Sequence, residues 1–135
     1  MTDDRLLSGI RILVVEDEML VLMALEDLLA DLGCTSIAVA GSLEKALALI
    51  AAEKFDLATL DVNLDGKNSY PIAEALVDAG VKFAFCTGYG EHGLSEAYAS
   101  HPVLNKPYGS PQLVKVLSAL LDRELEPSVK SKARL

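Results

Sequence analysis

The alternation of short apolar runs with segments of helical periodicity is the feature that most limits the fold of this 135-residue chain. Ile10–Val15 is an almost continuous apolar run, as expected of a strand that is covered on both faces. Leucines then recur at helical spacing from Leu22 to Leu32. Strand and helix patterns that alternate in this way are typical of βαβ units, whose strands form a parallel sheet.

The same alternation continues along the rest of the chain. Further strands are predicted at Thr35–Ala40, Phe55–Leu60, Val81–Cys86 and Val103–Asn105. Further helices are predicted after the capping residue Ser42, from Ser69 to Ala79, after Gly88, and from Ser110 onward. A polar loop is expected over Asp61–Ser69. We therefore predict an α/β fold, a doubly wound five-stranded parallel sheet with five helices.

Composition sets the class of protein. One domain is predicted over residues 8–124, followed by a polar tail at 125–135 that is expected to be disordered. The net charge of −8 argues against a nucleic-acid partner, because such a surface needs basic patches to neutralise phosphates. No apolar stretch approaches the length of a membrane span, so no membrane partner is expected and a cytoplasmic location is predicted.

The two cysteines and two histidines do not point to a metal or a disulfide site. Cys34 and Cys86 form no metal-binding spacing, and reduced thiols are expected, with Cys86 buried. His92 and His101 have no partner at ligand spacing. Both histidines are therefore predicted to be surface residues.

Polar residues stand where the predicted strands end. Glu16 and Asp17 follow the first strand, Asp61 follows the third, Thr87 follows the fourth, and Lys106 follows the fifth. The carboxyl ends of parallel strands meet at one edge of the sheet, where ligands of doubly wound folds bind. These five side chains are therefore expected to converge although they are far apart in sequence.

The chemistry of this set favours a divalent metal and a phosphoryl group. Carboxylates within about 4–6 Å repel one another unless a cation joins them, and Mg²⁺ suits carboxylate oxygens and retains exchangeable waters. The backbone carbonyl of Asn63 is a further candidate ligand. Asp61 can act as a nucleophile toward phosphorus and form an acyl phosphate. Thr87 and Lys106 can then donate to the oxygens of the transferred group.

With these residues in place, the chain resembles a receiver domain of the two-component response-regulator family. The matching residues are Glu16, Asp17, Asp61, Thr87 and the pair Lys106–Pro107. The resemblance implies a flavodoxin-like strand order 2-1-3-4-5, with Asp61 as phosphoacceptor and Glu16, Asp17, Asp61 and the Asn63 carbonyl as Mg²⁺ ligands. It implies Thr87 and Lys106 as the residues that sense the phosphoryl group, and a sensor histidine kinase as its donor.

Two features refine the resemblance. Phe85–Tyr89 is similar to the Phe-Ala-Thr-Gly-x-Tyr signature of an alphaproteobacterial receiver subgroup, many of whose members are stand-alone, with Cys86 in place of alanine and Tyr89 one residue early. Val103 occupies the strand-five position where most receivers carry an aromatic residue that swings inward on activation. The resemblance thus implies a single-domain response regulator that catalyses only its own phosphorylation and dephosphorylation. Phosphorylation would then switch an interaction surface for an unknown downstream protein.

Several other functions remain open at this point. The protein could be a phosphate sink or a relay intermediate, which the sequence does not separate from a switch. A phosphohydrolase with an aspartyl nucleophile would need a second acid two residues after Asp61, where Asn63 stands. A mononucleotide binder of the same architecture would need a phosphate-binding loop after the first strand, where the acidic run Glu16–Glu18 stands instead. A docking-only receiver is disfavoured by the complete set of site residues.

Overall fold

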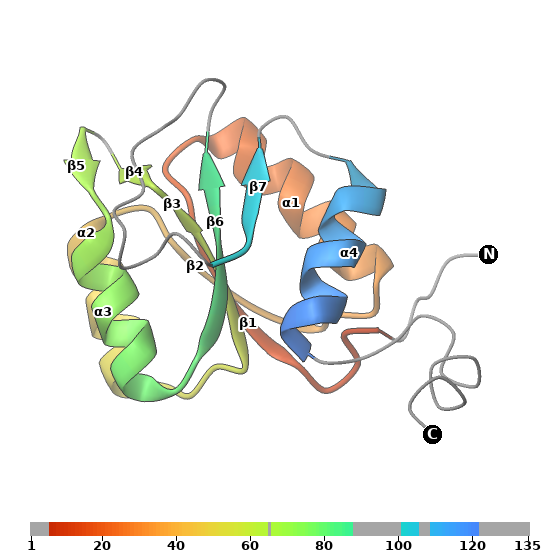
Figure 1. The fold of residues 1–135 in the computed structure, drawn as a ribbon, viewed down its shortest axis with the longest axis horizontal. Helices are drawn as coiled ribbons and strands as arrows, with labels where there is room; N and C mark the ends of the chain where they lie inside the picture. Colours follow the sequence, from red (N-terminus) through yellow and green to blue (C-terminus); the bar gives the residue numbers. More distant parts are fainter. Residues whose placement is uncertain (1–5, 65, 88–100, 106–108, 122–135) are drawn as a thin grey trace.

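The computed structural model describes residues 6–64, 66–87, 101–105 and 109–121, which form a parallel sheet with helices on both faces (Figure 1). The strands of this sheet are β1 (Arg11–Val15), β2 (Ser36–Ala40), β3 (Leu57–Asp61), β6 (Lys82–Thr87) and β7 (Val103–Asn105). They lie in the order β2-β1-β3-β6-β7, and all neighbouring pairs are parallel. The predicted fold class and strand order are therefore confirmed.

Helices cover the two faces of the sheet in pairs. Within the described residues these are α1 (Met19–Asp31), α2 (Leu43–Ala52), α3 (Tyr70–Ala79) and α4 (Ser110–Leu121). Figure 1 shows α2 and α3 on one side of the sheet and α1 and α4 on the other. The helix predicted after Gly88 falls in residues 88–100, which lie outside the described ranges. In the described part of the chain, no helix is both long and apolar enough to span a membrane.

Two apolar cores, one on each face, hold the layers together. In the first core, α1 contributes Leu25 and Leu29, and α4 contributes Leu113 and Leu117. The second core lies against α2 and α3. Every residue of β3 is buried, and of its apolar side chains Leu57 lies in the first core while Ala58 and Leu60 lie in the second. The apolar side chains of β1 alternate between the two cores, which explains the almost continuous apolar run Ile10–Val15 in the sequence.

The ends of two helices follow the local chemistry of the sequence. At the start of α2, the Ser42 Oγ accepts a hydrogen bond from the Lys45 amide at 3.2 Å, as predicted for an N-cap. Pro71 lies in the first turn of α3, where its missing amide hydrogen costs nothing. Gly80 ends α3 with a φ of 75°, a left-handed conformation that glycine adopts without steric cost.

The segment predicted as a polar loop, Asp61–Ser69, contains a short antiparallel hairpin instead. Its strands are β4 (Asn63–Leu64) and β5 (Lys67–Asn68). The Asn63 side chain accepts a hydrogen bond from the Gly66 amide at 2.9 Å, which fixes the turn. Strands of two residues are too short to show the period-two alternation by which a strand is detected in sequence.

Candidate functional site

Three carboxylates lie together at the carboxyl edge of the sheet. Glu16 and Asp17 follow β1, and Asp61 is the last residue of β3, which is the parallel neighbour of β1. One carboxylate oxygen from each of the three residues lies within 4.8 Å of the others. The predicted convergence of these acids is therefore present in the structure, and it follows from the register of the two central strands.

Backbone amides orient two of the three carboxylates. The Glu18 amide donates to the Glu16 Oε2 at 3.1 Å, and the Asn63 amide donates to the Asp61 Oδ1 at 3.3 Å. Glu16 is 3% exposed and Asp61 is 7% exposed, whereas Asp17 is exposed to solvent. The cluster is thus held by the chain on one side and open to solvent on the other.

This arrangement fits a hard divalent cation. Carboxylates at such distances repel one another, and the repulsion is larger for groups removed from water than for exposed ones. A cation such as Mg²⁺ relieves this repulsion, since it binds a few carboxylate oxygens and keeps waters for exchange. The fit rests on Glu16, Asp17 and Asp61. The fourth ligand expected from the sequence, the Asn63 carbonyl, remains a prediction.

Thr87 lies beside the acid cluster at the end of β6. The register pairs Asp61 with Cys86, so Thr87 is one residue further along the neighbouring strand. The Val62 amide donates to the Cys86 carbonyl at 3.1 Å and ties the two strand ends together. Thr87 is 3% exposed, and its hydroxyl donates to the Asn105 Oδ1 at 3.2 Å. The predicted hydroxyl therefore stands at the same edge as the carboxylates.

The contact with Asn105 was not expected from the sequence. Asn105 is the last residue of β7 and the register partner of Thr87. Its only mark in the sequence is a polar amide at a strand end, directly before Lys106. Lys106 itself lies outside the described residues, so its predicted place in the site is not tested.

Other predicted residues have different outcomes. Cys34 and Cys86 are both buried and reduced, and burial raises the pKa of the Cys34 thiol.

His101 is half-buried and stacks on Phe83 with ring centroids 4.8 Å apart, so the prediction of a surface position is wrong for it. The aromatic side chain that covers the imidazole comes from a neighbouring strand, which a local sequence pattern does not reveal. His92 lies outside the described residues.

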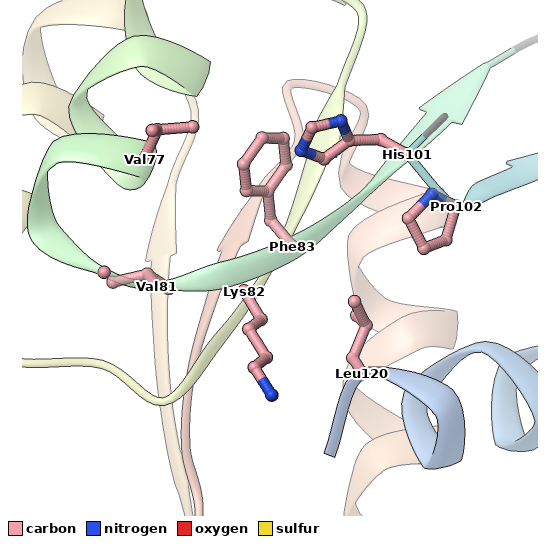
Figure 2. A pocket seen from close by; sticks show the side chains of 8 residues that line it. Val77, Val81, Lys82, Phe83, His101, Pro102 and Leu120 are labelled. Atoms are coloured by element: carbon pink, nitrogen blue, oxygen red, sulfur yellow. The ribbon is translucent and has the colours of Figure 1, made fainter. Parts of the chain in front are cut away.

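Figure 2 shows the side chains that line a cavity of about 260 Å³. This cavity lies at the start of β6, whereas the acidic edge lies at its end. It is formed where β6 begins and where α3 and α4 end. Its side chains are mainly aliphatic and aromatic, including Val77, Phe83 and Leu120, with Lys82 and His101 as the polar members. No carboxylate or hydroxyl lines it among the described residues, so it offers none of the groups of the acidic site.

The fold and the acidic edge define the class of protein. Residues 12–118 match the family model of the response regulator receiver domain, and the chain belongs to this family. A search of curated proteins found no significant match.

Individual solved structures are similar over nearly their whole length. The solution structure of SdrG from Sphingomonas melonis Fr1 is 39% identical, with a TM-score of 0.77 over 86% of this chain and 98% of SdrG. The BeF3-activated conformation of SdrG from Pseudomonas melonis Fr1 is also 39% identical, with a TM-score of 0.73 over 82% of this chain and 95% of that one. The receiver domain of the Erythrobacter litoralis PhyR response regulator is 29% identical, with a TM-score of 0.74 over 89% and 95% of the two chains.

Proposed function

We propose that this receiver accepts a phosphoryl group on Asp61 from a sensor histidine kinase, in a reaction that depends on Mg²⁺. The observation that carries the proposal is the cluster of Glu16, Asp17 and Asp61 within 4.8 Å, with the Thr87 hydroxyl at the adjacent strand end. The activated form of the similar SdrG structure was obtained with BeF3, which supports the same chemistry here.

In the proposed reaction, a carboxylate oxygen of Asp61 forms a bond to phosphorus while the bond between phosphorus and the donor nitrogen breaks. The imidazole of the kinase leaves, and Asp61 becomes an acyl phosphate. Bound Mg²⁺ would supply charge neutralisation for the incoming phosphoryl oxygens. Glu16, Asp17 and the Asn63 carbonyl would hold that ion together with Asp61.

The remaining residues would act on the transferred group. The Thr87 hydroxyl would donate a hydrogen bond to one phosphoryl oxygen, and the Lys106 ammonium would pair with another. These new contacts would rearrange the strand ends that carry the two residues. Phosphorylation would thereby change a surface that is recognised by a downstream protein, in a cytoplasmic signalling pathway.

The test is the intact mass of the protein after incubation with acetyl phosphate and Mg²⁺. Wild type should gain one base-labile phosphoryl group, and Asp61→Asn should gain none because its neutral amide cannot replace the carboxylate as nucleophile. Asp56→Asn is the matched control, since Asp56 lies just before β3 and its Oδ2 accepts from the Arg11 amide instead. An equal adduct on wild type and Asp61→Asn would refute the proposal, as would failure with both acetyl phosphate and a phosphorylated histidine kinase.

A further inference from the structure

We propose that Asn105 is a positioning residue that holds the Thr87 hydroxyl in its resting orientation and releases it when Asp61 is phosphorylated. The inference rests on the proposed function, because it concerns the hydroxyl that would contact the phosphoryl group. It adds a residue that competes with the phosphoryl group for the same proton.

The geometry at the ends of β6 and β7 carries this inference. Thr87 and Asn105 are register partners on adjacent parallel strands, and the Thr87 Oγ1 donates to the Asn105 Oδ1 at 3.2 Å. Thr87 is buried, whereas the Asn105 side chain is exposed on an edge strand of the sheet. The Thr87 hydroxyl is therefore held from the side of the edge strand β7, whereas β3, which carries Asp61, lies on the other side of β6.

A threonine hydroxyl carries a single proton. It can donate this proton to the side-chain Oδ1 of Asn105 or to a phosphoryl oxygen, but not fully to both. Activation thus requires the hydrogen bond between Thr87 and Asn105 to break. A neutral hydrogen bond of typical net strength corresponds to an equilibrium factor of about five, so Asn105 biases the protein toward the resting state by that factor.

The hydrogen bond to the Asn105 side chain also connects the Thr87 hydroxyl to β7. This strand reads Val103-Leu104-Asn105, so Asn105 is its one polar side chain. Val103 and Leu104 are apolar, so neither side chain can exchange a hydrogen bond with the phosphoryl site. When the hydrogen bond between Thr87 and Asn105 breaks, β7 loses a contact with β6. Phosphorylation can therefore act on β7 without an aromatic residue.

The affinity for BeF3⁻ in the presence of Mg²⁺, followed by NMR titration of the full chain, tests this inference. Asn105→Ala and the nearly isosteric Asn105→Leu remove the competing acceptor, and each should bind BeF3⁻ about fivefold more tightly than wild type. Asn105→Asp keeps an acceptor for the hydroxyl and should bind no more tightly than wild type. The exposed position of Asn105 makes these substitutions compatible with folding.

A double-mutant cycle with Thr87→Val separates positioning from a general effect on the strand. In the Thr87→Val background, Asn105→Ala should leave the affinity unchanged, because no hydroxyl remains to be released. An unchanged or weaker affinity of Asn105→Ala in the wild-type background would overturn the inference, and so would the same gain in both backgrounds. Absence of BeF3⁻ binding by wild type would instead refute the proposed function, and this inference with it.

Discussion

Asp61 combines two properties that are unfavourable in a residue kept only for stability. It is 7% exposed, and its carboxylate lies within 4.8 Å of two others. Burial weakens the solvation of a charge, and neighbouring charges of the same sign add repulsion. One amide hydrogen bond from Asn63 offsets part of this cost. Such a cluster is better explained by a ligand that joins the acids than by the fold alone.

Thr59 is a second buried polar residue of β3, and it does not belong to the acid cluster. Thr59 is 1% exposed, and its hydroxyl has no hydrogen-bond partner among the described residues. Its register partners Val14 and Ala84 are buried and apolar. We predict that Thr59→Val, which keeps the shape and removes the hydroxyl, raises the free energy of unfolding by about 1 kcal/mol.

Urea denaturation measures this effect. Thr59→Ser is the matched control, because it keeps the hydroxyl, loses a buried methyl group and should lower the free energy of unfolding by about 1 kcal/mol. Destabilisation by Thr59→Val would show that the hydroxyl has a partner in solution.

At the scale of elements, two serines precede helices but differ in their contacts. The Ser42 Oγ caps α2 by accepting from the Lys45 amide, whereas the Ser69 side chain makes no capping bond to α3. Ser69 is fully buried, and its hydroxyl has no hydrogen-bond partner among the described residues. We predict that Ser42→Ala lowers the free energy of unfolding by about 1 kcal/mol, because an amide at the start of α2 loses its acceptor.

Ser69→Ala serves as the control in the same denaturation experiment. It loses no hydrogen bond, and removal of its unpartnered buried hydroxyl should leave the free energy of unfolding unchanged or raise it by up to about 1 kcal/mol. Equal losses for the two variants would mean that the hydrogen bond from the Lys45 amide to Ser42 contributes nothing measurable to stability.

The elements also show what the sequence can and cannot predict. The strands and helices of the sheet were predictable because buried strands and amphipathic helices leave long, distinct patterns, as in Ile10–Val15 and Leu22–Leu32. The order of the strands was implied by the resemblance to receiver domains and not by these patterns. The acid cluster was predictable because parallel strands bring their ends together. The hairpin around Gly66 is too short to leave such a pattern. The contacts of Asn105 and His101 depend on the register between β6 and the segment that contains β7, and single positions in the sequence carry no trace of that register.

At the scale of the whole molecule, the charge is strongly negative and part of it is concentrated at one edge. The chain has a net charge of −8, and three of its carboxylates form the cluster at the ends of β1 and β3. We therefore expect cations to stabilise the protein in two ways, by general screening and by binding to the proposed metal site. A test of the metal site has to separate these two contributions.

We predict that the order of stability of wild type and Asp61→Asn depends on Mg²⁺. In a metal-free buffer, Asp61→Asn should be the more stable by about 1 kcal/mol, because it removes one buried charge from the cluster and keeps an Oδ1 acceptor for the Asn63 amide. At ten times its dissociation constant, Mg²⁺ should stabilise wild type by about 1.4 kcal/mol through binding linkage. The variant lacks one ligand and should gain much less, so the difference in stability should vanish or reverse.

Thermal and urea unfolding at constant ionic strength, with NaCl replacing MgCl2, measure this difference without the contribution of screening. Asp56→Asn changes the net charge by the same amount at a site outside the cluster, and its response to Mg²⁺ should match that of wild type. A parallel response of wild type and Asp61→Asn across the whole titration would place the bound ion elsewhere. Mg²⁺ bound elsewhere would have no direct role in the proposed chemistry of Asp61, even if the phosphoryl group were still found on that residue.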